Sequence, residues 1–138
     1  MEIQDIMTKQ VHTVRSDTPL IEVARLMRDK RIGDVLVTHR DGTLRGIVTD
    51  RDIVVRADAV GKSLDRTQVG EICSDKVVQL LPTSTIDDAV KVMREHAIRR
   101  IPVVRDGRPI GIISIGDLAR LQDPRSALAQ ISLAEPNN

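Results

Sequence analysis

The amino-acid sequence predicts an α/β fold, of the α+β kind, built from two successive β-α-β-β-α repeats. The first observation is an internal duplication: a shift of 66 positions brings Met27 onto Met93 and Val37 onto Val103. The second is that each half alternates short β-branched segments with segments of helical apolar spacing. The third is the composition, with 41% hydrophobic, 30% charged and 0% aromatic residues. These values are typical of a globular chain, and its core must be aliphatic.

The charge pattern argues against two classes of partner. The net charge is +1 and both signs are interspersed, so neither a nucleic acid nor a membrane is an expected partner. No apolar run is long enough to span a membrane, and the acidic N-terminus is not typical of a signal peptide. Cys73 is the single cysteine, so no intrachain disulfide can form and a cytoplasmic location is expected.

The duplication divides the chain into four segments. We predict a first repeat, a polar linker, a second repeat and a C-terminal tail, at residues 1–59, 60–68, 69–122 and 123–138. Each repeat begins with a short apolar turn and a brief extended segment. The tail begins with Asp123 and Pro124, which should stop the preceding helix, and we expect the tail to be poorly ordered.

A helix and two strands complete the body of each repeat. In the first helix, Thr18 is the expected N-cap and Pro19 the first helical residue. In the second, Thr85 and Asp88 resemble a capping box. Strands joined by a glycine-containing turn follow each helix, at residues 35–38, 43–48, 101–104 and 110–113.

The last strand of each repeat ends in a hydroxyl residue followed three positions later by an aspartate. Thr49 and Asp52 form the first motif, Ser114 and Asp117 the second, and a helix is expected after each. A carboxylate can accept hydrogen bonds from two ribose hydroxyls, while a hydroxyl and free helix amides can bind phosphate oxygens. The alternative is that the hydroxyls only cap helices. The recurrence of the motif in matching contexts favours a sugar-phosphate ligand.

The order and spacing of these elements resemble a pair of CBS domains, also called a Bateman module. The resemblance extends from about residue 3 to residue 121 and rests chiefly on residues 6–8, 46–52, 98–103 and 111–117. It implies that the repeats are related by a pseudo-twofold axis and bind AMP, ADP or ATP in clefts between them, with no cofactor required. The chain is also similar to small two-repeat members of the hypoxic-response type, which implies regulation of an unknown protein target.

The resemblance implies a set of nucleotide-binding residues. The motif aspartates would hold ribose, the hydroxyl residues ribose or phosphate, and an arginine pair phosphate, while backbone of the extended segments would line the adenine. The full set is Thr49, Asp52, Ser114, Asp117, Arg99, Arg100, Val11, His12, Thr13, Val77, Val78, Ile101 and Pro102.

The two repeats differ at the arginine pair. Where the second repeat has Arg99 and Arg100, the first has Gly33 and Asp34. An isolated arginine pair is often only a solvated surface pair. The resemblance instead implies that these arginines reach phosphate held at the first motif, so we expect the first cleft to be the phosphate-competent one.

No pattern typical of an enzyme is found, so a non-catalytic module is expected. His12, His39, His96 and Cys73 lie at no metal-ligand spacing, so no metal site is expected. Apolar residues on the helices predict a homodimer that signals by a change of shape or assembly. The alternatives that remain open are a dimeric adaptor with vestigial clefts, and a sensor of S-adenosylmethionine, NAD or metal.

Overall fold

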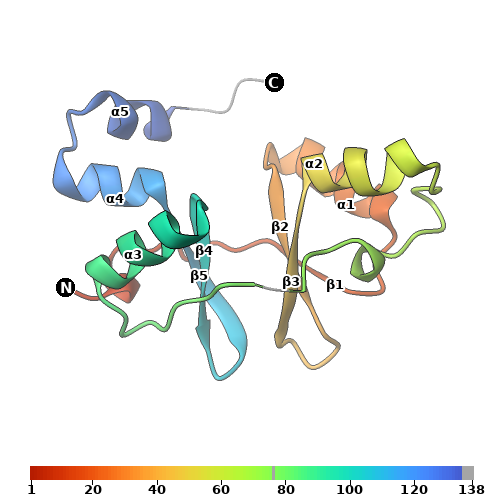
Figure 1. The fold of residues 1–138 in the computed structure, drawn as a ribbon, viewed down its shortest axis with the longest axis horizontal. Helices are drawn as coiled ribbons and strands as arrows, with labels where there is room; N and C mark the ends of the chain where they lie inside the picture. The colour runs from red at the N-terminus through yellow and green to blue at the C-terminus, as the bar shows by residue number, and fades with distance from the viewer. Residues whose placement is uncertain (76, 135–138) are drawn as a thin grey trace. The chain divides into compact units, whose positions relative to one another are not determined.

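The computed structural model describes residues 1–75 and 77–134, which divide into two compact units (Figure 1). The central unit is the continuous segment His12–Val77. The terminal unit combines Met1–Val11 with the chain from Val78 onward. Each unit has its own small sheet and its own helices, which confirms the predicted α/β class.

The central unit has a three-stranded sheet in the order β1-β2-β3, with bounds Thr13–Arg15, Asp34–Thr38 and Leu44–Thr49. β1 and β2 are parallel, and β2 and β3 are antiparallel. The helical segments are α1, α2, a π-helical segment and two 3-10 turns, at Leu20–Lys30, Asp50–Asp52, Ile53–Ala57, Asp58–Val60 and Val69–Glu71. The first motif therefore lies at the junction of β3 and α2.

The core of the central unit fixes the end of β3. Leu20, Val23 and Met27 are buried on one face of α1, at helical spacing. They belong to one cluster with Val35 of β2 and Val48 of β3. The strand that carries the first motif is thus anchored by packing just before the motif begins.

The terminal unit repeats this arrangement with a smaller sheet. Its antiparallel strands are β4 and β5, at Arg100–Arg105 and Arg108–Ser114. Leu80 makes a parallel bridge to Val103, in the place that β1 takes in the central unit. A 3-10 turn and helices α3, α4 and α5 complete the unit, at Ile3–Asp5, Ile86–His96, Ile115–Gln122 and Ala127–Leu133.

The N-terminal segment of each sequence repeat pairs with the last strand of the other repeat. In the terminal unit, Thr8 forms an antiparallel bridge with Ile112 of β5. In the central unit, Ser74 forms the same bridge with Ile47 of β3. The compact units therefore do not coincide with the sequence repeats, whose boundaries remain a prediction from the duplication.

The observed starts of helices α1 and α3 agree with the predicted starts only in part. The capping box of Thr85 and Asp88 is confirmed, with N–O distances of 3.0 and 2.9 Å between each amide and the other side chain. The prediction for Thr18 is wrong by one residue. Pro19 is the N-cap of α1, because its extended ψ of 142° keeps it outside the helix, and its apolar ring offers no atom for a side-chain cap bond.

In place of the poorly ordered tail predicted for residues 123–138, the structure has helix α5 at Ala127–Leu133, and residues 135–138 lie outside the described part of the chain. After the break at Asp123, the Ser126 hydroxyl accepts a hydrogen bond from the Ala129 amide at 3.1 Å and caps helix α5. Ala129 is fully buried, so the short helix is docked on the terminal unit rather than extended into solvent. None of the described helices combines the length and the apolar character that a membrane crossing requires.

Candidate functional site

The first motif is a complete capping box. The Asp52 amide donates to Thr49 Oγ1 at 3.1 Å, and the Thr49 amide donates to Asp52 Oδ2 at 2.9 Å. These two bonds fix the direction of both side chains. Within the described residues, Asp52 Oδ1 accepts no hydrogen bond. The cap thus holds a carboxylate with one oxygen available at the end of the strand.

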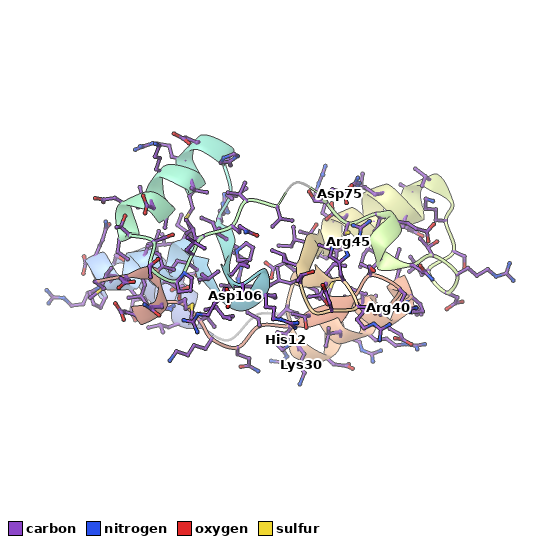
Figure 2. The ribbon with its side chains drawn as sticks, turned by 90° about the horizontal axis from the view of Figure 1, so that it is seen from below. His12, Lys30, Arg40, Arg45, Asp75 and Asp106 are labelled. Carbon is purple, nitrogen blue, oxygen red and sulfur yellow. The ribbon has the colours of Figure 1, made fainter. Side chains whose placement is uncertain are left out.

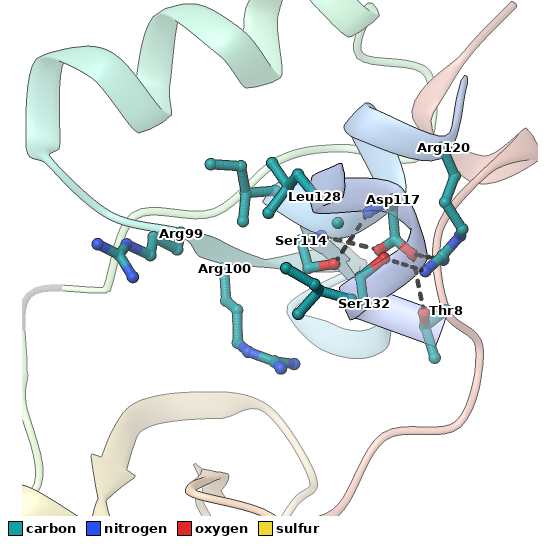
Figure 3. Close-up of a pocket in the computed structure, with 11 residues that line it drawn as sticks. Thr8, Arg99, Arg100, Ser114, Asp117, Arg120, Leu128 and Ser132 are labelled. Atoms are coloured by element: carbon teal, nitrogen blue, oxygen red, sulfur yellow. Dashed lines mark hydrogen bonds and ion pairs between the residues drawn. The ribbon is translucent and has the colours of Figure 1, made fainter. Parts of the chain in front are cut away.

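The second motif has the same box and further bonds (Figure 3). The Asp117 amide donates to Ser114 Oγ at 3.2 Å, and the Ser114 amide donates to Asp117 Oδ2 at 2.8 Å. In addition, Asp117 Oδ1 accepts from Arg120 Nη2 and, at 3.5 Å, from the Thr8 hydroxyl. Asp117 is only 5% exposed. Both of its oxygens are therefore already engaged.

A pocket of about 480 Å³ opens beside the second motif, within the terminal unit. Its volume falls in the range of small-molecule sites. In Figure 3 Arg99 and Arg100 lie on one side of Ser114, and Thr8 and Arg120 on the other. The remaining lining residues come from the start of α4 and from α5: Ile115, Gly116, Asp117, Leu128, Ile131 and Ser132.

Backbone bonds place a different residue pair beside each motif. The Ile115 amide donates to the Arg99 carbonyl at 2.9 Å, and the Asp50 amide donates to the Gly33 carbonyl at 3.0 Å. Arg99 and Arg100 are thus neighbours of the second motif within its own unit. The predicted reach of this arginine pair to the first motif joins two units and stays a prediction.

The other predicted binding residues lie near the boundaries of the units or inside a core. Val11, His12, Val77 and Val78 lie where the chain passes from one unit to the other. The His12 carbonyl accepts from Leu36, and Thr13 begins β1. Ile101 is fully buried, and the carbonyl of its neighbour Pro102 accepts from Leu80 at 3.0 Å. A role in binding for any of these residues remains a prediction.

Three polar residues of the pocket were not anticipated from the sequence: Thr8, Arg120 and Ser132. Thr8 is 109 positions from its partner Asp117, so local spacing gives no indication of the contact. A usable signal existed for Arg120, because it follows Asp117 by three positions on a predicted helix, where opposite charges pair.

Cys73 lies in a separate polar cluster of the central unit. Arg45 Nη1 donates to Asp75 Oδ1 at 2.9 Å (Figure 2). Arg45 Nη1 also donates to Cys73 Sγ at 2.9 Å, and Arg45 Nη2 donates to the Gly70 carbonyl at 3.0 Å. Burial raises the pKa of the Cys73 thiol, and the charge of Arg45 opposes that shift. No group of three or more His, Cys, Asp or Glu side chains suited to a metal ion occurs among the described residues.

The duplicated sheet-and-helix units and their matching motifs define a tandem regulatory-domain architecture. The family model for the CBS domain matches residues 3–58 and 69–123, so the chain belongs to the CBS-domain family. It is 38% identical to the CBS domain-containing protein YhcV of Bacillus subtilis, with 94% of each chain covered. It is 34% identical to hypoxic response protein 1 of Mycobacterium tuberculosis, with 92% of this chain and 88% of that one covered. Such paired CBS domains are typically non-catalytic.

Solved structures support the same fold. A crystal structure of hypoxic response protein 1 with two coordinated zinc ions has a TM-score of 0.81 at 33% identity and covers 88% of this chain and 98% of that one. The CBS domain pair of protein MJ0100, in complex with 5′-methylthioadenosine and S-adenosyl-L-methionine, has a TM-score of 0.76 at 28% identity, covering 88% and 99%. A hexameric CBS-CP12 protein from cyanobacteria has a TM-score of 0.72 at 27% identity, covering 96% and 80%. Proteins of this fold thus include an adenosyl-ligand complex and an oligomer.

Proposed function

We propose that this protein is a regulatory module that binds an adenosine-type nucleotide, AMP, ADP or ATP, and signals to a protein partner. The observation that carries the proposal is the preorganised carboxylate of the first motif. Asp52 Oδ2 has a second lone pair and Oδ1 is unoccupied by the described residues, so the carboxylate can accept from both hydroxyls of a ribose. Its rotamer is fixed by the capping box before a ligand arrives, which lowers the entropic cost of binding.

The positions of the two motifs support a phosphate-bearing ligand. Each motif opens a helical segment, whose N-terminal end carries a partial positive charge that favours an anion. The aliphatic composition also fits, because an adenine ring can be held between Val and Ile side chains where no aromatic ring exists. The adenosyl complex of the MJ0100 pair supports the adenosine part of the proposal.

The signal would be a population shift. A nucleotide that binds one arrangement of the protein more tightly than another raises the population of that arrangement. The protein partner then needs only to distinguish the two arrangements, and the coupling is reciprocal. No catalytic step is involved.

Binding is tested directly, since the chain contains no Trp, Tyr or Phe and bound adenine therefore dominates its ultraviolet absorbance. The protein is incubated with AMP, ADP, ATP or S-adenosylmethionine, freed of excess ligand, and measured by absorbance and calorimetry. At 100 times the Kd a ligand adds about 2.7 kcal/mol of stability, which a thermal melt also detects. Asp52→Asn should lose binding, while the neighbouring Asp50→Asn, exposed at the surface, should keep it. Absence of any binding among the four ligands would overturn the proposal.

S-adenosylmethionine is the second candidate ligand. It is favoured by one observation, its presence in the MJ0100 complex. It shares the ribose and adenine of the nucleotides but carries no phosphate, so it does not need an arginine. Retention of S-adenosylmethionine alone, unaffected by Arg99→Ala with Arg100→Ala, would select it over the nucleotides.

We also propose that the module is a homodimer. The segment after the first motif exposes Val54, Val55 and Val60 by 58%, 43% and 64%, and such neighbouring apolar side chains are typical of an interface. A second copy would cover them by twofold symmetry. Light scattering at micromolar concentration should give the dimer mass. The double variant Val54→Asp/Val55→Asp should give the monomer and the exposed control Lys62→Asp the dimer. A monomeric unsubstituted protein would refute the dimer.

A further inference from the structure

We propose that helix α5 is an autoinhibitory lid on the second motif, which must be displaced before Ser114 and Asp117 can bind a ligand. The proposal rests on the proposed function, since it concerns the regulation of one of the two nucleotide motifs. It makes the two motifs unequal in a way that the repeated sequence does not suggest. Asp52 of the first motif keeps a carboxylate oxygen free of the described residues, whereas the Asp117 carboxylate of the second motif is engaged and α5 forms one wall of its pocket.

The first line of evidence is the occupation of Asp117. Ser114, Arg120 and Thr8 together take up both of its carboxylate oxygens, and its side chain is 3% exposed. A carboxylate in this state has little capacity left for the two hydroxyls of a ribose. The corresponding Asp52 keeps one oxygen free of the described residues.

The second line of evidence is the link between Asp117 and α5. The Arg120 guanidinium donates through Nη2 to Asp117 Oδ1 and through Nη1 to Ser132 Oγ at 3.1 Å (Figure 3). Ser132 in turn donates to the carbonyl of Ala129 at 2.8 Å, within α5. A protein hydroxyl thus occupies an arginine that could otherwise bind a ligand phosphate in the same pocket.

The third line of evidence is a residue that permits α5 to approach. A Cβ atom built on Gly116 would lie 2.6 Å from Ser132 Cβ and 3.0 Å from Ser132 Oγ, so only glycine allows this contact. The first motif has Arg51 at the corresponding position, and Arg51 is exposed. Gly116 therefore allows helix α5 to pack closely against the second motif, whereas the first motif has no glycine at this position.

The lid is held weakly enough to be displaced. Of its apolar side chains, Ala129 is fully buried, whereas Leu128, Ile131 and Leu133 are 44%, 70% and 64% exposed. Burial of a single alanine contributes little, and an element with so little buried apolar surface belongs to the low-stability end of a fold. A ligand or a partner that captures the exposed residues can shift the equilibrium towards the open state.

The test compares two arginine substitutions on the same helix. Ala129→Arg places a large charged side chain at a fully buried position and should release α5, while Leu133→Arg changes an exposed position and should not. Calorimetry with AMP, ADP and ATP measures the number of sites per chain. We expect one site in the unsubstituted protein and in Leu133→Arg, and two in Ala129→Arg. The added site should disappear when Asp117→Ala is combined with Ala129→Arg.

Amide hydrogen exchange at residues 114–117 gives a readout that needs no nucleotide. Exchange should be faster in Ala129→Arg than in Leu133→Arg. Equal site numbers in these two variants, when nucleotide does bind, overturn the lid. If no variant binds nucleotide, the proposed function fails, and exchange alone decides whether α5 is a removable cover. Faster amide exchange in Ala129→Arg than in Leu133→Arg supports a removable cover, and equal exchange in the two variants overturns it.

Discussion

The two copies of the strand–helix motif have the same capping box but different surroundings. In both, a hydroxyl and a carboxylate three positions apart exchange hydrogen bonds with each other's amides. Around Asp52 one oxygen stays available, whereas Asp117 is enclosed by Arg120, Thr8 and helix α5. Local sequence determines the cap, and neighbours distant in sequence determine whether the cap can also bind a ligand. A duplicated motif therefore does not imply duplicated binding.

The largest expected difference between the copies concerns Gly46 of β3 and Gly111 of β5, which lie three positions before Thr49 and Ser114. A Cβ on Gly46 would lie 2.1 Å from the Ser74 carbonyl oxygen, while one on Gly111 would lie 2.4 Å from Met7 Sδ. A backbone oxygen at 2.1 Å cannot yield cheaply, but a methionine side chain can, and the Thr8 carbonyl oxygen, 3.0 Å from a Cβ on Gly111, needs a smaller shift. Gly46→Ala should lower the free energy of unfolding by about 3 kcal/mol and Gly111→Ala by about 1 kcal/mol. Urea unfolding followed by circular dichroism measures both. Equal losses of unfolding free energy in the two variants would contradict the expectation that Gly46 is more tightly packed than Gly111.

The second-largest difference in stability is expected between substitutions of Asp117 and of Asp52. Asp117→Ala leaves the partly buried Arg120 guanidinium without its carboxylate and removes a cap, so it should cost about 2–3 kcal/mol. Asp52→Ala removes a cap only and should cost about 1 kcal/mol. Asp117→Asn, which keeps an acceptor oxygen for the Ser114 amide, should fall between the two. The same urea experiment applies, and a larger loss in Asp52→Ala would contradict the comparison.

A smaller effect is expected at the residue before each aspartate. Gly116→Ala pushes α5 away through Ser132 and should cost about 1 kcal/mol. Arg51→Ala should change stability by less than about 0.5 kcal/mol, because Arg51 is exposed. Hydrogen exchange in α5 should rise in Gly116→Ala alone. Unchanged exchange there would mean that the helix does not depend on this glycine.

The smallest expected effect is a pH dependence that arises from the N-terminal cap of α3. Hydrogen bonds from the Thr85 backbone amide and side chain lower the pKa of Asp88 at the start of α3. Its contribution is complete above the pKa of an unfolded aspartate, about 3.9, and is lost as the pH falls through the lower folded value. The helix α1 begins at Pro19 without a side-chain cap, so it lacks this titration. Acid unfolding of Asp88→Asn should be shallower below about pH 4; an unchanged profile would exclude this cap as a contributor.

Much of the fold was predictable because its determinants are local. Both long helices, the strand pairs, the glycine turns and the box of Thr85 and Asp88 follow from spacing and capping rules, and the structure confirms them within one or two residues. The duplication added weight to each, since a pattern seen twice at one spacing is seldom accidental.

The remainder depends on contacts that spacing does not encode. Thr8 donates a hydrogen bond to Asp117, which lies 109 positions away in the sequence. Helix α5 is stable only because Ala129 is buried against the rest of the terminal unit. An isolated seven-residue helix would not form in water. The sequence could therefore indicate which residues carry the motifs, but not which motif is covered.

The division of the chain has a consequence for synthesis. The central unit, His12–Val77, is one continuous segment and can close as soon as its last residue leaves the ribosome. Met1–Val11 belongs to a unit completed only by the chain from Val78 onward, and Ile3, which is fully buried in the structure, lacks its cluster partners Leu80 and Ile101 until then. At about 5–20 residues per second this delay is on the order of 5–20 s. Residues 1–11 are thus made before the central unit but complete their folding after it, and during that interval chaperones can bind their exposed apolar side chains.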